Sequence, residues 1–124
     1  MYVHQCDKLL REQQHYAGLT TEIYRLLTNS PSNTPSIKEI AEFLHITPRT
    51  LHRRLHKEQT TYQQIVIQFR LSLAKRYLKE TSLPISEVSM LVGYADHSNF
   101  YRTFKKETGI TPQQFRQQIE SLAA

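Results

Sequence analysis

The sequence predicts an all-α protein in which two similar helical units are joined by one long helix. Along most of its 124 residues, apolar side chains recur at intervals of three and four, while strand signals are scarce. A pattern of two short helices around a tight turn occurs twice, and an amphipathic stretch lies between the two copies. A chain of this length forms one compact domain, or two very small ones that share a core.

The first predicted segment, residues 1–30, is helical. Within it, residues 7–28 are expected to form one helix or two, because apolar residues fall on one face both before and after Gly18. The stretch SPSNTP, residues 30–35, is a loop by composition. We expect it to be the boundary between this segment and residues 31–124.

The first unit, at about residues 36–58, is predicted to contain two short helices. Ser36 can accept a hydrogen bond from a free N–H of the first turn while Glu39 reaches back, which forms a capping box. Thr47 caps the second helix, and Pro48 occupies its first position, where a missing N–H costs nothing. One face of the first helix is apolar and carries Ile37, Ile40, Ala41 and Leu44.

The long linker helix is expected at about residues 61–80. Apolar residues recur here at spacings of three and four, which predicts an amphipathic helix about 28 Å long at ~1.5 Å per residue. Its stripe consists of Tyr62, Val66, Phe69, Leu73 and Tyr77.

The second unit, at about residues 84–109, repeats the arrangement of the first. A short helix leads to a turn at Gly93, and Asp96 caps the helix that follows. Gly109 ends that helix, and a last helix is expected at about residues 111–120.

The second helices of the two units match residue by residue at an offset of 49. The leading helices match at an offset of 48, so one residue has been gained at the turn. Two short helices, a tight turn and a capped second helix form the helix-turn-helix pattern, which this chain contains twice. The matched pairs in the second helices include Leu51 with Phe100, Arg53 with Arg102, Leu55 with Phe104 and Lys57 with Lys106.

Positive charge is concentrated in the middle of the chain. Sixteen Lys and Arg residues against eleven Asp and Glu residues give a formal net charge of +5 and a pI near 9.5. Residues 47–80 hold eight positive and two negative side chains, whereas residues 1–46 hold four and five. A basic region of this kind fits a nucleic-acid footprint and a solvated basic face equally well.

The second helix of each unit has one apolar side and one polar side. On a helical wheel, Leu51 and Leu55 define the buried side of one, and Phe100 and Phe104 that of the other. The opposite sides carry arginine and small polar groups, which suit base edges because Arg donates two hydrogen bonds to guanine and Asn pairs with adenine. Lysines further along the two helices are better placed for phosphates, namely Lys57, Lys105 and Lys106.

Two stretches resemble the AraC/XylS family of bacterial transcription regulators. These are SIKEIAEFLHITPRTLHRRLHKE and ISEVSMLVGYADHSNFYRTFKKETGITPQQFR, and the resemblance covers roughly residues 36–117. It implies two helix-turn-helix subdomains, built as homeodomain-like three-helix units and joined by the linker helix. It also implies a sequence-specific, cytoplasmic regulator that binds double-stranded promoter DNA through both second helices, and that usually activates transcription with RNA polymerase as a partner.

The resemblance also identifies candidate contacts to DNA by position. The candidates for base contacts are Arg49, Thr50, His52, Arg53, His97, Ser98, Asn99 and Arg102. The candidates for phosphate contacts are Thr47, His56, Lys57, Lys105 and Lys106.

Three residues depart from the family pattern. Ser89 replaces a usual Ala, and we expect its hydroxyl to form a hydrogen bond within its own helix. His45 stands where the second unit has Gly93, and Gln59 replaces a frequent Gly. A positive φ at His45 or Gln59 would cost about 1 kcal/mol.

Residues 1–30 resemble the segment that precedes the DNA-binding domain in family members with an N-terminal effector-sensing domain. The resemblance implies that a small-molecule effector acts only through a domain absent from this chain.

The residues give no support for an enzyme, a cofactor or a metal site. His52 and His56 stand at i and i+4, but no further ligand has a recognised spacing to them. Cys6 is the single cysteine, which makes a reducing, cytoplasmic setting the simpler assumption, and no apolar run approaches the ~18 residues of a membrane span. The main alternative to a DNA reader is a helical interaction module whose basic face binds an acidic protein.

Overall fold

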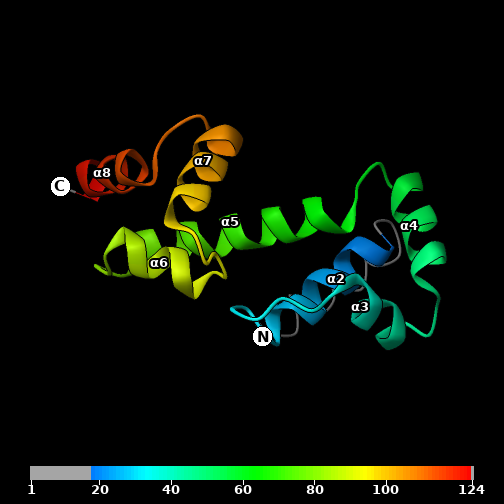
Figure 1. The fold of residues 1–124 in the computed structure, drawn as a ribbon. Helices are drawn as coiled ribbons and strands as arrows, with labels where there is room; N and C mark the ends of the chain where they lie inside the picture. Colours follow the sequence, from blue (N-terminus) through cyan, green and yellow to red (C-terminus); the bar gives the residue numbers. More distant parts are fainter. Residues whose placement is uncertain (1–17, 124) are drawn as a thin grey trace, which may run out of the picture. The chain divides into compact units, whose positions relative to one another are not determined.

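In a computed structural model that describes residues 18–123, every regular element is an α-helix (Figure 1). The predicted all-α fold is therefore confirmed for this part of the chain. The prediction of a helix before Gly18 lies outside the described residues. The helices are α2 (Leu19–Thr28), α3 (Ile37–Phe43), α4 (Pro48–Lys57), α5 (Tyr62–Glu80), α6 (Ile85–Leu91), α7 (His97–Thr108) and α8 (Pro112–Ala123).

The described chain divides into two compact units. Within the described part, the first unit contains residues 18–30 and 34–67, and the second contains residues 31–33 and 68–123. Helix α5 belongs to both, because its residues up to 67 lie in the first unit and those from 68 on lie in the second.

The core of the first unit is formed by helices α2, α3 and α4. Helix α4 contacts both α2 and α3. Ile23 and Leu27 of α2, Ile40 of α3, and Leu51 and Leu55 of α4 are all at most 1% exposed. Residues of the predicted N-terminal segment thus share a core with the first helix-turn-helix. The predicted relation of residues 1–30 to an effector-sensing domain stays a prediction.

Local hydrogen bonds explain where the helices of the first unit begin. The Ser36 hydroxyl accepts from the Glu39 N–H at 3.2 Å, and it donates to the Glu39 carboxylate at 3.4 Å. The carboxylate therefore meets the Ser36 hydroxyl, where the capping box predicted the backbone N–H. The Thr47 hydroxyl accepts from the Thr50 N–H at 3.1 Å, which caps α4 as predicted.

Two residues other than glycine adopt positive φ angles in the first unit. His45 has φ 59° and Gln59 has φ 60°, so both departures from the family pattern fall where the backbone favours glycine. A left-handed conformation at each of these residues costs about 1 kcal/mol.

The core of the second unit combines aliphatic residues with aromatic rings. Phe100 and Phe104 of α7 are fully buried, and the Phe104 ring lies 5.8 Å from that of Phe115 on α8. The Asp96 carboxylate accepts from the Ser98 N–H at 2.9 Å, and Gly109 ends α7 with a φ of 86°. Both features were predicted.

Helix α8 begins with a reciprocal capping box that the sequence analysis did not identify. The Thr111 hydroxyl accepts from the Gln114 N–H at 3.1 Å, and the Gln114 side chain accepts from the Thr111 N–H at 2.9 Å. The spacing T-x-x-Q is the signal that would have found it. Helix α8 also continues to Ala123, past the predicted end at residue 120, and residues 121–123 contain no Gly or Pro that would end it earlier.

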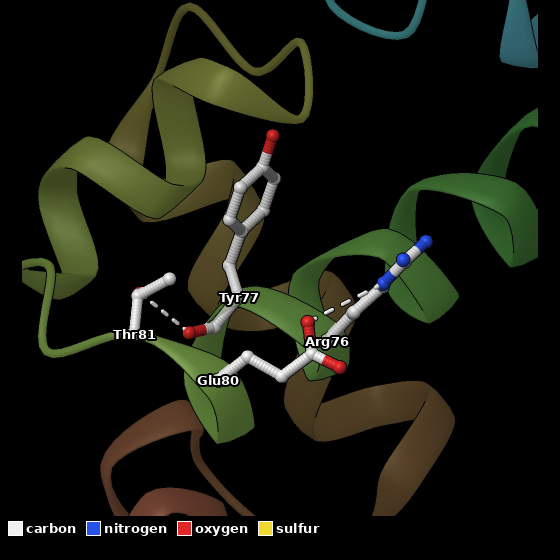
Figure 2. Close-up of polar contacts among 4 residues, drawn as sticks. All are labelled: Arg76, Tyr77, Glu80 and Thr81. Carbon is white, nitrogen blue, oxygen red and sulfur yellow. Dashed lines mark hydrogen bonds and ion pairs between the residues drawn. The ribbon is translucent and has the colours of Figure 1, made fainter.

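Arg116 connects α8 by hydrogen bonds to the end of α5 and to the segment that follows it. Its guanidinium donates to the carbonyl oxygens of Leu78 at 3.3 Å, Thr81 at 3.3 Å and Leu83 at 2.6 Å. Figure 2 shows the end of α5, where the Thr81 hydroxyl donates to the Tyr77 carbonyl at 2.6 Å. The bond from Arg116 to Leu78 reaches a carbonyl in the last turn of α5, where intrahelical partners run out, whereas the Tyr77 carbonyl also accepts from the Thr81 N–H at 3.0 Å.

The expectation for Ser89 is wrong. Its side chain is 1% exposed, and its hydroxyl oxygen has no hydrogen-bond partner among the described residues. The hydroxyl is enclosed with the core of the second unit and does not reach a carbonyl of its own helix. A buried hydroxyl without a partner costs about 1–3 kcal/mol.

Ser89→Ala should therefore raise the free energy of unfolding by about 1–2 kcal/mol, because it removes the buried polar atom and leaves the backbone unchanged. Urea denaturation followed by circular dichroism measures this. Ser86→Ala, at an exposed position on the same helix, is the matched control and should change stability by less than about 0.5 kcal/mol. A loss of stability in Ser89→Ala would contradict the assignment.

Candidate nucleic-acid interface

The second helix of each helix-turn-helix, α4 and α7, is anchored by two fully buried residues. Leu51 and Leu55 of α4, and Phe100 and Phe104 of α7, are each 0% exposed. Residues spaced by four lie on the same side of a helix, so each pair fixes which side faces solvent. The exposed sides of α4 and α7 are the candidate interface.

The candidate base-contact residues lie on these exposed sides. In α4, Arg49, His52 and Arg53 are exposed, and Thr50 is half-buried with its hydroxyl 2.9 Å from that of Thr47. In α7, all four candidates are exposed: His97, Ser98, Asn99 and Arg102. Each unit therefore presents its own candidates together on one helix.

The candidate phosphate contacts are also exposed. Thr47 precedes α4 and holds the cap described above, while His56 and Lys57 lie in the last turn of that helix. Lys105 and Lys106 occupy the same place in α7. Positive charge at the C-terminal end of a helix also interacts favourably with the helix dipole.

The arginines at the interface have unoccupied hydrogen-bond donors. Among residues 18–123, Arg49, Arg53 and Arg102 form no hydrogen bond or ion pair, whereas Arg76 pairs with Glu80 at 3.5 Å (Figure 2). A guanidinium that is not neutralised by its own protein can make a bidentate contact with a guanine edge or a phosphate. This is the chemistry that an acidic, polyvalent ligand requires.

The exposed side of α4 borders a shallow hollow of about 500 Å³. Besides residues of α4, two threonines of the following loop line it, and they were not among the predicted site residues. Thr61 caps α5 by accepting from the Gln64 N–H at 3.1 Å, so a helix N-terminus lies beside the hollow. The lining residues are Arg49, His52, Arg53, His56, Thr60 and Thr61.

In α7 the His97 ring is oriented by a neighbouring ring. It lies 5.6 Å from the Tyr101 ring in an edge-on arrangement, one helical turn further along. Edge-on contacts between aromatic rings are favourable, which restricts the directions in which His97 projects.

In the described part of the chain, no group of three or more His, Cys, Asp or Glu side chains is placed to hold a metal ion. Within the same residues, no helix has both the length and the apolar character needed to cross a membrane.

Two exposed basic helices, each the second helix of a capped helix-turn-helix, define a DNA-binding protein of the helix-turn-helix class. The sequence matches the family described as a helix-turn-helix domain over residues 40–118. A crystal structure of an AraC-type DNA-binding domain protein from Chromobacterium violaceum is 25% identical, with a TM-score of 0.76, and covers 80% of this chain and 89% of that one. The chain belongs to the AraC/XylS family of DNA-binding transcriptional regulators.

Two curated relatives illustrate the range of the family. The ornithine utilization regulator of Pseudomonas aeruginosa is 41% identical over 113 residues, which cover 91% of this chain and 33% of the relative. The transcriptional activator CfaD of Escherichia coli is 40% identical over 76 residues, covering 61% and 29% respectively. The chain thus spans about a third of the length of these two relatives, whose names describe a regulator and an activator.

Substituting the exposed arginines should separate base contacts from phosphate contacts. Arg53→Ala and Arg102→Ala should each cost about 1–3 kcal/mol on a specific site with little effect on random duplex, because a lost base contact matters only where the right base is present. Lys57→Ala should weaken binding to both duplexes alike. Fluorescence anisotropy at fixed salt measures the affinities. Equal losses on both duplexes for the arginine variants would assign them to phosphates.

Proposed function

We propose that this chain reads a specific DNA sequence by inserting α4 and α7 into successive major-groove segments of one duplex. The observation that carries the proposal is the pair Arg53 and Arg102, which occupy the same position of the repeat. Both are exposed and form no interaction within the described residues. Arg is suited to this position because it can bind guanine O6 and N7 together.

The length of α5 is consistent with this arrangement. Its 19 residues correspond to about 28 Å at ~1.5 Å per residue, which approaches the ~34 Å of one turn of B-DNA. A single chain would then read two adjacent half-motifs without forming a dimer. The candidate phosphate contacts at the ends of α4 and α7 would set the register of each helix on the backbone.

The regulatory role of the chain is proposed to be activation of transcription at a promoter, with RNA polymerase as its partner. Support comes from relatives such as CfaD, whose name describes a transcriptional activator. A small-molecule effector would act through a further domain, which fits the small share of the relatives' length that this chain covers.

A helical module that binds an acidic protein is the competing proposal. Net positive charge alone supports both, and salt-dependent DNA binding does not separate them, because non-specific binding also depends steeply on salt. Both α4 and α7 expose an arginine at the same repeat position opposite a buried pair, Arg53 and Arg102. This favours base reading, since a merely acidic partner does not require two matched helices.

Selecting bound sequences from a random duplex pool tests the proposal. We expect two short half-motifs whose centres are about 10–11 base pairs apart, because two helices on one face of B-DNA must be one turn apart. The Arg53→Ala and Arg102→Ala variants serve as controls, and each should lose information in a different half-motif. A single motif, or no enrichment at all, would contradict reading by both helices.

A further inference from the structure

The turn between α6 and α7 is contacted by Arg70, which projects from α5 within the second unit. Its guanidinium carbon lies 5.0 Å from the centre of the Tyr94 ring, and its Nε atom is buried. This placement is a cation–π contact, and the planar guanidinium is the group best suited to it. Arg70 is thus held against the turn and does not extend freely into solvent.

The neighbouring residue, Gly93, makes room for the guanidinium. Its φ is 105°, and a Cβ atom added to it would lie 3.1 Å from Arg70 Nε and 3.2 Å from Nη2. The guanidinium therefore occupies the space that a side chain at position 93 would require. Glycine is needed here both for its backbone angle and for this close approach.

Tyr94 connects this contact to the buried side of α7. Its side chain is 7% exposed, and its ring lies 5.4 Å from that of Phe100. The Phe100 ring in turn lies 5.8 Å from the Phe104 ring. Arg70, Tyr94, Phe100 and Phe104 therefore form a continuous series of contacts from α5 to the pair that orients α7.

We propose that Arg70 is a positioning residue for DNA reading by α7. By holding Tyr94 and the backbone of Gly93, its guanidinium fixes the turn and thereby the direction in which Asn99 and Arg102 project. Arg70 determines specificity at the α7 half-motif through these contacts and not through a contact with a base. This inference rests on the proposed function.

The turn of the first unit has no glycine and tyrosine at the positions equivalent to Gly93 and Tyr94, so the first unit serves as an internal control for the effect of Arg70. At the offset of 48 residues, His45 stands in place of Gly93, and Ile46 stands in place of Tyr94. A β-branched aliphatic residue cannot form a cation–π contact. Substitution of Arg70 should consequently leave reading of the α4 half-motif unchanged.

Arg70→Met and Arg70→Lys test the inference on the full chain. Affinity is measured for the selected duplex and for two derivatives, each with base substitutions in one half-motif. Both variants should lower discrimination at the α7 half-motif about threefold or more, with discrimination at the α4 half-motif unchanged. Arg70→Lys should not restore the wild-type value, because an ammonium keeps the charge but not the planar stacking surface.

Variants of Tyr94 and Gly93 extend the test. Tyr94→Phe retains the ring and should retain discrimination, whereas Tyr94→Leu should lower it as Arg70→Met does. Gly93→Ala displaces the guanidinium, so combining it with Arg70→Met should lower discrimination no further than the more severe single variant does. If the losses of discrimination in the two single variants add up in the double variant, Arg70 and Gly93 do not act through the same contact, and the proposed positioning role is overturned.

If Arg70→Met does not fold at the assay temperature, Arg70→Lys carries the test, because it keeps the charge and most of the aliphatic stem.

Other outcomes separate the alternatives. An equal loss of affinity on all duplexes that Arg70→Lys restores would make Arg70 a phosphate contact and overturn its positioning role. Equal discrimination by folded variants and wild type would also overturn it, while leaving the proposed function intact. If the wild-type chain itself shows no preference in either half-motif, the proposed function fails as well.

Discussion

The arrangement of the candidate interface follows from the burial of two apolar residues one helical turn apart in each of α4 and α7. Leu51 and Leu55 in one helix, and Phe100 and Phe104 in the other, are removed completely from solvent. Burying side chains of this size contributes about 1.5–3 kcal/mol each, and truncating them in a packed core costs about 2–5 kcal/mol. The orientation of each helix is therefore fixed by the core, and the polar residues on the opposite side face solvent as a consequence.

The two units have similar exposed sides on α4 and α7, but different residues pack beneath these helices. In the first, aliphatic residues pack between α2, α3 and α4, and the Thr20 hydroxyl of α2 donates to the Glu58 carboxylate at the end of α4 at 3.2 Å. In the second, aromatic rings connect the turn, α7 and α8, and Arg116 binds three carbonyl groups near the end of α5. The exposed sides of α4 and α7 are thus similar although the cores beneath them differ, and each lies opposite a buried pair at the same position of the repeat.

Features that depend on near neighbours in the chain could be predicted from the sequence. Thr47, Asp96 and Gly109 each act within one turn of their helix, and each was identified with its role. The buried pairs followed from helical periodicity, which is a property of local spacing. The sides of α4 and α7 that lie opposite these pairs could then be predicted as well. The candidate base-contact residues lie there, and all are exposed except the half-buried Thr50.

Features that depend on contacts between distant segments could not be predicted in this way. The loop at residues 30–35 has the composition of a boundary, yet α2 on one side of it contacts α4 on the other, and Ile23 and Leu27 of α2 are buried in the core of the first unit. The approach of Arg70 to Gly93 likewise depends on tertiary packing. Ser89 was expected to form a hydrogen bond within its own helix, and its buried hydroxyl has no partner among the described residues.

Directed cleavage of DNA from matched tethers would show whether α4 and α7 lie on the same duplex. Lys57→Cys and Lys106→Cys, each combined with Cys6→Ser, place a single attachment point for a DNA-cleaving iron chelate at the same repeat position in α4 and in α7. If both helices lie on one duplex, each tether should produce its own cluster of cuts on the selected site, with the clusters about one helical turn apart. Cleavage from only one tether, or from both at the same base pairs, would contradict the account.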